Sequence, residues 1–168
     1  LSPLFAYLSL KVKQSSVGPV FYGQERIGLK GVPFTILKFR SMYENAEHGG
    51  PQLSKDEDSR CTPFGAIMRK WRLDELPQFF NVINGSMSVV GPRPALTREV
   101  TLYNSTYERR LNAKPGITGP WQISGRSDLD LQTSISLDLN YLTNWSFTRD
   151  LWIIVSTVGA VFKGKGAY

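Results

Sequence analysis

The chain has 168 residues, of which 41% are hydrophobic and 12% aromatic, enough to bury one core and too few for two independent ones. Lys and Arg number 20 against 14 Asp and Glu, so the formal charge of +6 favours a polyanionic partner: nucleic acid, anionic lipid or a phosphorylated substrate. A single cysteine, Cys61, excludes an internal disulfide, and the lone His48 excludes a His-Cys metal cluster, so any metal must bind oxygen ligands.

Two apolar runs, one near each end of the sequence, are candidates for contact with a membrane. Residues 1–10 are almost wholly apolar, precede Lys11 and Lys13, and have the pattern of a segment that continues from a longer one. Residues 151–162 form the second run, and the lysines that follow it suit an anionic interface. Both runs are shorter than the roughly 20 residues of a spanning helix, so we expect no membrane span. A buried core helix explains the second run equally well.

Residues 20–40 have the pattern of a β-hairpin. Two runs with alternating polar side chains flank a glycine-bearing turn at Lys30 and Gly31. The polar residues 44–59, rich in glycine and acidic side chains, predict a surface loop.

Helix signals begin at Thr62. Thr62 is a suitable N-cap and Pro63 a suitable first helical residue, so we expect a helix from there to about Trp71. A second helix is expected over residues 74–84, ended by Gly85.

The second half of the sequence alternates helices with loops rich in glycine and proline. Residues 86–90 predict a short strand, and the prolines of GPRP, residues 91–94, predict a rigid turn. Residues 97–110 predict a charged surface helix, residues 114–126 a loop with one short extended piece, and residues 128–162 two final helices. The fold class is therefore α+β: a small, mainly helical domain with a β-hairpin and short strands.

The densest chemical cluster is RKWRLDELPQ, residues 69–78, in which three cations precede the adjacent carboxylates Asp74 and Glu75. If Asp74 lies near a helix start, the helix N-terminus and the cations favour its ionised form, which can attack phosphorus or bind a divalent cation. Adjacent helical positions diverge by about 100°, so the two carboxylates are expected to have different roles. Alternatively, both only favour the first turn of a helix, as acidic residues commonly do.

Four further cations are candidates for substrate binding. Arg93 is held between two prolines, which preorganises its guanidinium for a phosphate, although a stiff surface turn explains it as well. Arg126 follows Gly125, which allows close approach to a ligand or a simple turn. Lys38 and Arg40 lie two residues apart on a strand and could face one site, or could be solvated charges that protect a strand edge.

Six segments, in the same order along the chain, resemble the bacterial sugar transferases known as monotopic polyprenyl-phosphate phosphoglycosyl transferases. They are Ser2-Pro3, GPVFYGQERIG (18–28), FTILKFRSM (34–42), LDELPQFFNVINGSMSVVGPRP (73–94), KPGITGPWQISGR (114–126) and the terminal GAY. A lone DEL or PRP is a weak signal, whereas this co-linear agreement covers nearly the whole chain. It makes a functional role the better interpretation of Asp74 and Glu75.

The resemblance implies transfer of a hexose 1-phosphate from a UDP-sugar to undecaprenyl phosphate, with release of UMP. Asp74 would be the nucleophile, and Glu75 would assist the attack of the polyprenyl phosphate on the aspartyl phospho-sugar, which predicts ping-pong kinetics. The family also implies Mg²⁺, with Asp74 as a ligand, and this ion suits carboxylate oxygens and a diphosphate. Arg69, Arg93 and Arg126 lie at motif positions that resemble phosphate or nucleotide contacts.

In this family a re-entrant helix enters one leaflet, breaks at Ser-Pro and returns to the same face. The resemblance therefore implies that residues 1–13 are the exit half of such a helix, with Ser2 and Pro3 at the membrane break, and that residues 14–168 are the catalytic domain. The expected location is the bacterial inner membrane, with the catalytic domain on its cytoplasmic face. The expected role is the first membrane step in the synthesis of capsule, exopolysaccharide or O-antigen.

Several features stay open at the level of sequence. Galactose or glucose is the expected hexose, with galactose favoured by resemblance alone, and homo-oligomerisation is undecided. A basic nucleic-acid-binding domain is one alternative, but its cations should line one face, whereas these cluster beside carboxylates that would repel a phosphate backbone. A catalytically silent membrane scaffold is another, but it would not need Asp74, Glu75 and Arg93. We therefore expect an enzyme without a nucleic-acid partner.

Overall fold

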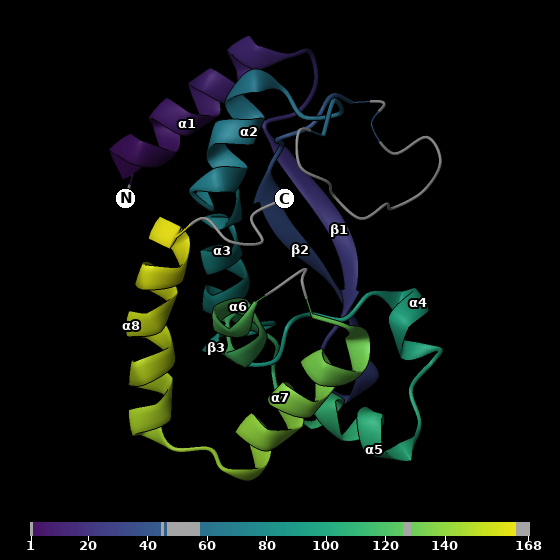
Figure 1. Ribbon diagram of the computed structural model, residues 1–168. Helices are drawn as coiled ribbons and strands as arrows, with labels where there is room; N and C mark the ends of the chain where they lie inside the picture. Colours follow the sequence, from purple (N-terminus) through teal and green to yellow (C-terminus); the bar gives the residue numbers. More distant parts are fainter. Residues whose placement is uncertain (1, 45, 47–57, 126–128, 164–168) are drawn as a thin grey trace.

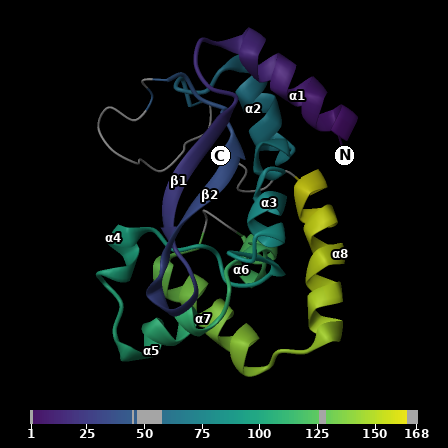
Figure 2. The same cartoon turned by 180° about the vertical axis from the view of Figure 1, so that it is seen from behind.

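The computed structural model describes residues 2–44, 46, 58–125 and 129–163 (Figure 1). These residues form helices around two small sheets, as the α+β prediction requires. Helices α1 (Ser2–Ser15) and α8 (Phe147–Lys163) lie along the same edge of the molecule in two opposite views (Figures 1 and 2). Among the described residues, no helix combines the length and the apolar character needed to cross a membrane.

The hairpin predicted for residues 20–40 is confirmed. Strand β1 (Phe21–Ile27) pairs antiparallel with β2 (Pro33–Phe39) along its whole length. The turn between them contains a 3₁₀ element, η1 (Leu29–Gly31), in which Lys30 has a left-handed φ of 55°. This turn places the free edge of β2 towards the helices that follow.

The main core forms where α1 and α2 (Pro63–Lys70) cover the end of the hairpin. Its fully buried members are Leu8, Val12, Phe39 and Met68. Helix α1 supplies two of these side chains and continues to Ser15, two residues past the expected boundary at residue 13, and that boundary stays a prediction.

Helix α2 begins as predicted. The Thr62 hydroxyl oxygen accepts a hydrogen bond from the N–H of Gly65 at 2.9 Å, which caps the helix. A side chain at Gly65 would collide with the backbone of Ser41, so this glycine lets α2 pack closely on the segment that follows β2.

The single helix predicted for residues 74–84 is divided into two elements. They are the 3₁₀ turn η2 (Leu73–Glu75) and α3 (Gln78–Ile83), separated by Pro77. Proline has no N–H to bond back along a helix, so the turn cannot continue as one regular helix. Gly85, with a φ of 82°, ends α3 as predicted.

The prediction of one helix over residues 97–110 is wrong. The segment contains α4 (Thr97–Val100), α5 (Ser105–Glu108) and the start of η3 (Arg109–Asn112). The Asn104 side chain accepts a hydrogen bond from the N–H of Tyr107 at 2.9 Å and so starts a new helix where the pattern suggested continuity. Arg110, expected on the surface, is only 3% exposed.

A second sheet brings two of the predicted loops together. Strand β3 (Ser88–Val90) pairs in parallel with β4 (Gly116–Thr118), the expected extended piece of residues 114–126. The same segment also contains a helix that was not predicted, α6 (Pro120–Ser124), which begins with Pro120 in the first turn. The two final helices are confirmed as α7 (Leu131–Thr143) and α8.

Candidate active site

The turn between α2 and α3 carries the two adjacent carboxylates. Arg72 precedes it with a φ of 56°, a left-handed conformation that costs a non-glycine residue about 1–2 kcal/mol. Leu73 and Leu76 pack against the main core on either side of Asp74 and Glu75. The backbone at the two carboxylates is therefore fixed by apolar packing and held in a strained conformation.

A buried amide joins α3 to the hairpin. The Asn81 side chain accepts a hydrogen bond from the N–H of Leu37 at 3.0 Å and donates one to the carbonyl oxygen of Thr35 at 2.8 Å. Because Asn81 is 2% exposed, these bonds form in a low dielectric and satisfy the free edge of β2. They bring Lys38, the next strand residue, beside the carboxylate turn.

Glu75 lies between two cations. Lys38 Nζ donates to Glu75 Oε1 at 2.9 Å, and Arg72 Nη1 donates to Oε2 at 3.0 Å. Burial by itself would raise the pKa of Glu75, but the charges of Lys38 and Arg72 outweigh it and lower the pKa to about 2. Glu75 is thus ionised, and both of its oxygens are occupied.

Asp74 is in the opposite situation. It is 7% exposed, and within the described part of the chain no hydrogen bond or ion pair reaches its carboxylate. Burial raises the pKa of Asp74 to about 6, while the charge of Lys38 opposes the shift and the charge of Glu75 adds to it.

This result corrects the expectation that cations and a helix start hold the pKa of Asp74 down. The two nearest cations pair directly with Glu75, and a 3₁₀ turn of three residues has little dipole to offer. Near neutral pH the Asp74 carboxylate is therefore still mostly ionised, but it is poorly solvated, a state that favours reaction with an electrophile or a cation.

Arg69, in the last turn of α2, is the third cation near the two carboxylates. Its charge lowers the pKa of Asp74, as do those of Lys38 and Arg72, so all three lie within electrostatic reach of the carboxylate. Its Nη1 also lies 3.5 Å from Cys61 Sγ. Three cations beside one paired and one unpaired carboxylate form a local positive field that suits a phosphorylated ligand.

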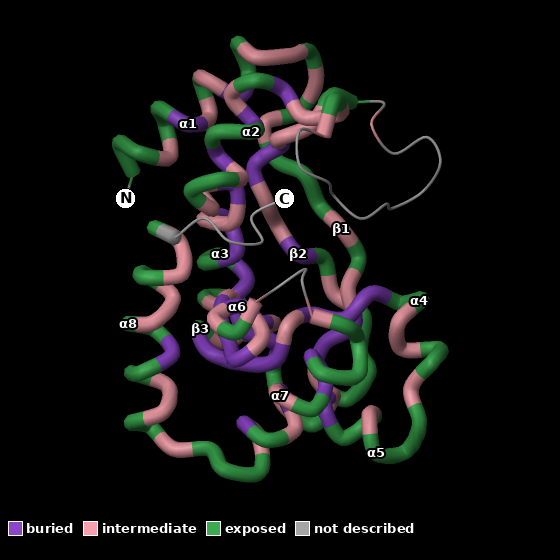
Figure 3. The backbone as a smooth tube through the Cα atoms, in the orientation of Figure 1, coloured by how far each residue is buried: buried purple, intermediate pink, exposed green. Residues whose placement is uncertain are grey.

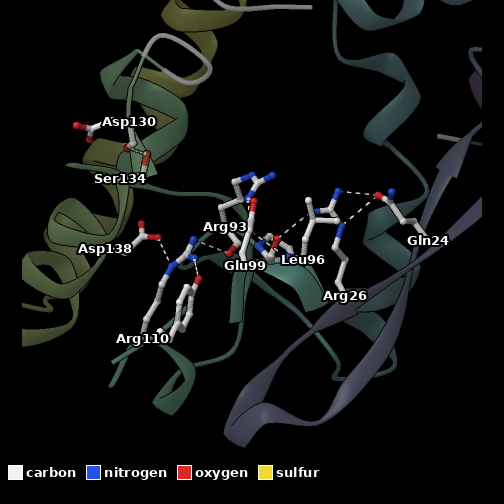
Figure 4. Close-up of polar contacts among 11 residues, drawn as sticks. Gln24, Arg26, Arg93, Leu96, Glu99, Arg110, Asp130, Ser134 and Asp138 are labelled. Atoms are coloured by element: carbon white, nitrogen blue, oxygen red, sulfur yellow. Dashed lines mark hydrogen bonds and ion pairs between the residues drawn. The ribbon is translucent and has the colours of Figure 1, made fainter. Parts of the chain in front are cut away.

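Arg93 belongs to a second cluster, at the turn after β3 (Figure 4). Its Nη1 donates to both carboxylate oxygens of Glu99, at 3.1 and 3.0 Å, and its guanidinium lies 5.1 Å from the ring centroid of Trp121. Glu99 in turn accepts a hydrogen bond from the N–H of Leu96 at 2.9 Å. The expected preorganisation of Arg93 agrees with these contacts.

Glycines allow the two loops of this cluster to approach. A side chain at Gly91 or at Gly116 would collide with the backbone of the opposite strand, and one at Gly119 would collide with the carbonyl of Gly91. The close packing places α6, and with it Trp121, against the turn that carries Arg93.

Arg26, on β1, lies within electrostatic reach of both clusters and was not among the residues predicted from the sequence. Its guanidinium donates to Gln24 Oε1 at 2.6 and 3.1 Å and to the carbonyl oxygen of Pro94 at 3.2 Å (Figure 4). Burial lowers the pKa of Arg26 to about 10, Arg93 adds to this shift, and the charges of Glu99 and Glu75 oppose it. The alternating polar residues of β1 were the signal that could have identified this side chain.

The structure buries the Arg40 side chain against the end of α1. It is 6% exposed, and its guanidinium donates to the carbonyl oxygens of Val17 and Ser16 at 2.8 and 2.7 Å, just past the end of α1. Strand β2 ends at Phe39, so the alternation that would have placed Lys38 and Arg40 on one face does not extend to Arg40. Neither a phosphate contact nor a solvated strand edge describes this residue. Arg126 lies outside the described residues.

The turn that carries Asp74 and Glu75 has one side chain whose chemistry suits a magnesium ion bound together with substrate phosphates. In the described ranges, no group of three His, Cys, Asp or Glu side chains comes together as a metal site. Asp74 is a carboxylate without a bonded partner, whereas both oxygens of Glu75 are engaged. Because Mg²⁺ in phosphoryl-transfer sites is commonly bound by one or two carboxylates, substrate phosphates and water, Asp74 has the required chemistry.

Comparison with known proteins gives consistent matches along the whole chain. A family model described as bacterial sugar transferase matches residues 1–164. The exopolysaccharide production protein ExoY of Sinorhizobium fredii is 43% identical to this chain over all of it and over 81% of the relative.

Two further relatives carry enzyme names. The undecaprenyl-phosphate galactose phosphotransferase of Salmonella typhimurium is 40% identical, and the UDP-glucose:undecaprenyl-phosphate glucose-1-phosphate transferase of Xanthomonas campestris is 45% identical. The alignments cover 99% and 100% of this chain but only 38% and 37% of those relatives, so the chain corresponds to a part of each.

Proposed function

Because the chain belongs to the bacterial sugar transferase family, we propose that it transfers a sugar 1-phosphate from a UDP-sugar to undecaprenyl phosphate and releases UMP. Relatives named as galactose and glucose phosphotransferases support these two hexoses as first candidates. The observation that carries the proposal is the unpaired, buried carboxylate of Asp74 beside three cations.

In the first half of the reaction, an oxygen of Asp74 attacks the sugar-bearing phosphorus of the UDP-sugar. A P–O bond to Asp74 forms, the P–O bond to UMP breaks, and UMP leaves with the bonding electrons as a phosphate monoester. The product is an aspartyl phospho-sugar. Poor solvation of Asp74 supports this step, since little water must be removed from the attacking oxygen.

In the second half, an oxygen of undecaprenyl phosphate attacks the same phosphorus. A new P–O bond forms, the P–O bond to Asp74 breaks, and the carboxylate is regenerated. A phosphate monoester has a second pKa of about 6, so the acceptor needs no strong base near neutral pH. This agrees with the low pKa of Glu75, which we propose assists by holding Lys38 and Arg72 where the acceptor phosphate enters.

The remaining cations stabilise negative charge on the phosphates. Lys38, Arg69 and Arg72 lie within electrostatic reach of the attacking carboxylate, and Arg93 is held by Glu99 and Trp121 at the GPRP turn. When bound, Mg²⁺ would withdraw charge from the diphosphate oxygens, and of the two carboxylates at this turn Asp74 is the one without an ion pair and would hold it.

Apolar surface on two helices supports a location at the cytoplasmic face of the bacterial inner membrane. Helix α8 is mostly exposed or half-buried along its length (Figure 3). Its exposed residues include an apolar stripe at helical spacing, and Ile153 is buried. The stripe consists of Leu151, Val155, Val158 and Phe162. Helix α1 exposes Leu4, Tyr7 and Leu10 beside Lys11. Such faces suit an element that lies in the membrane interface. The role of Ser2 and Pro3, the first two residues of α1, as a membrane break stays a prediction.

The transferase proposal is tested by UMP release from UDP-galactose and from UDP-glucose, with undecaprenyl phosphate and Mg²⁺. We expect turnover with one of the two donors and loss of at least about a thousandfold in Asp74→Asn, because the amide is not a nucleophile. Asp130→Asn is the matched control, since Asp130 caps α7 through its side chain and asparagine caps equally well.

Two outcomes would count against the proposal. If folded protein releases no UMP from either donor, transferase activity with these two hexoses is excluded. If wild type and Asp74→Asn release UMP equally, the protein is a transferase but Asp74 is not its nucleophile.

A further inference from the structure

Arg110 is a buried arginine whose bonds meet behind the turn that carries Arg93. Its Nε donates to Asp138 Oδ2 at 2.7 Å, its Nη1 to the hydroxyl of Tyr103 at 2.6 Å, and its Nη2 to the carbonyl oxygen of Arg93 at 2.8 Å (Figure 4). The side chains of Arg110 and Asp138 are 3% and 0% exposed. One guanidinium thus links η3, α7, the segment after α4 and the GPRP turn.

We propose that Arg110 and Asp138 are positioning residues for Arg93: they fix its backbone so that its guanidinium is ready for the diphosphate of the nucleotide sugar. This inference rests on the proposed function, in which Arg93 contacts that diphosphate. Neither Arg110 nor Asp138 touches the substrate in this account, and both act through Arg93.

The arrangement of the bonds favours positioning over stability alone. A buried ion pair loses much of its attraction to desolvation, and apolar side chains of similar volume would often stabilise the fold as well. What apolar side chains cannot do is bind a specific carbonyl oxygen. The bond from Arg110 to the Arg93 carbonyl fixes the peptide plane next to the residue whose side chain must point at the ligand.

Asp138 supports the same turn from α7. Burial raises the pKa of Asp138, and the charge of Arg110 and the backbone N–H of Arg93 act against that shift. Through its Oδ2, Asp138 holds the cation that bonds the Arg93 carbonyl, while its buried Oδ1 has no hydrogen-bond partner among the described residues.

The turn borders a small pocket. Its volume of about 10 Å³, lined among others by Pro92, Arg93 and Arg110, is about that needed for one water molecule. The side chain of Arg93 is restrained by Glu99 and Trp121. The carbonyls of Pro92 and Pro94 accept hydrogen bonds from the Gly116 N–H and from Arg26, and the carbonyl of Arg93 itself accepts one from Arg110. Loosening the backbone would misplace the guanidinium even with both side-chain partners present.

A double-mutant cycle on the dissociation constant for UDP tests the inference with the intact protein. Arg93→Ala should weaken UDP about tenfold or more, because a charge-assisted contact is lost. Arg110→Lys keeps the charge but cannot make three bonds in a fork, so it should weaken UDP about three- to tenfold. In the Arg93→Ala background, Arg110→Lys should have almost no further effect, because the residue through which it acts is gone.

A purely structural role gives a different pattern. If the two single effects multiply in the double variant, Arg110 does not act through Arg93 and the inference is overturned. If wild type does not bind UDP, Arg93 has no diphosphate to hold and the inference is overturned as well. UMP release plays no part in this measurement, so failure of the transferase proposal would be recognised separately.

Two more variants protect the test against unfolding. Tyr103→Phe removes a single bond to Arg110 and should give a smaller loss of UDP affinity, again absent when Arg93 is alanine. Asp150→Asn is the control: Asp150 accepts hydrogen bonds from Tyr141 and Trp145 at 2.6 and 3.1 Å, and among the described residues no hydrogen bond joins these three to Arg93 or Arg110. A loss of UDP affinity in Asp150→Asn equal to that in Arg110→Lys would show a general effect of destabilisation and overturn the inference.

Discussion

Two regions of this molecule bury a carboxylate among arginines and use it in opposite ways. At the turn behind Arg93, Asp138 is bonded directly to Arg110, which also bonds to two further oxygens. At the turn after α2, the nearby cations pair with Glu75, and Asp74 has no bonded partner within the described residues. The same residue types therefore build a bonded network in one place and leave a carboxylate without a bonded cation in the other.

Pairing with a cation, more than burial, distinguishes these two carboxylates. Both aspartates are buried and both have raised pKa values. Only Asp138 has a directly bonded cation that offsets the cost of burying its charge. The same substitution, aspartate to asparagine, should therefore have opposite effects on stability at the two positions.

The largest effect is expected for Asp138→Asn. It leaves the buried guanidinium of Arg110 without its counter-charge, so we expect the free energy of unfolding to fall by about 3–5 kcal/mol near pH 7. Urea unfolding at constant pH measures this loss. A change of less than about 1 kcal/mol would mean that Asp138 is not the partner that stabilises Arg110.

Asp74→Asn should instead stabilise the protein. The pKa of Asp74 is raised from 3.8 to about 6, so the folded state binds a proton more tightly than the unfolded state. Stability from this group is present below pH 3.8 and is lost as the pH rises through about 6, at a cost of at most about 3 kcal/mol.

The substitution removes that loss, so the gain in unfolding free energy should be full at pH 8 and should shrink towards pH 4. Unfolding curves at several pH values measure it. A variant that is less stable than wild type at pH 8 would contradict the account of an unpaired, desolvated carboxylate.

Arg40→Met should lower stability by about 1–3 kcal/mol without affecting catalysis by folded molecules. The guanidinium bonds two carbonyl oxygens past the end of α1, and methionine would leave them unsatisfied. Thermal unfolding gives the stability, and kcat/KM per folded molecule gives the catalytic effect. A selective rise in KM for the nucleotide sugar would instead restore the substrate-binding role expected from the sequence.

The smallest expected effect is a shift in the pH dependence of UMP release. Lys38 is the largest of the charges that hold down the pKa of Asp74, so Lys38→Met should raise this pKa further. The acid limb of the UMP-release profile should then move to higher pH, within about one pH unit. Glu75→Gln removes a charge that raises the pKa of Asp74, so residual activity should show the opposite displacement. If the acid limb of the pH profile lies at the same pH in Lys38→Met and in Glu75→Gln, ionisation of Asp74 does not set that limb.

The fold was predictable where local chemistry and final structure agree. The hairpin, the Thr62 cap and the end of α3 at Gly85 depend on turn geometry and capping, which short segments specify by themselves. The prediction failed over residues 97–110, because a helical pattern does not show that Asn104 will cap a new helix. It also missed α6, where glycine and proline suggested a loop throughout.

The candidate site was predictable as a set of residues and only partly as an arrangement. Motif positions identified Asp74, Glu75 and Arg93, but sequence alone could not show which carboxylate the cations would pair with. That choice depends on Asn81 docking α3 on β2, a contact across 44 residues. Arg26 and Arg110 were missed for a similar reason, since one partner of each, the Pro94 carbonyl and Asp138, lies 68 and 28 residues away.

The central claim is that Asp74 forms a covalent bond to the sugar phosphate, and the mass of the protein tests it most directly. The intact protein is incubated with UDP-galactose or UDP-glucose and Mg²⁺, without a lipid acceptor, and is then analysed whole and after proteolysis. We predict one hexose phosphate per molecule, on the peptide that contains Asp74, with an equal amount of UMP released and no adduct in Asp74→Asn. An adduct on another residue, or catalytic turnover on later addition of undecaprenyl phosphate with no adduct before it, would contradict the account.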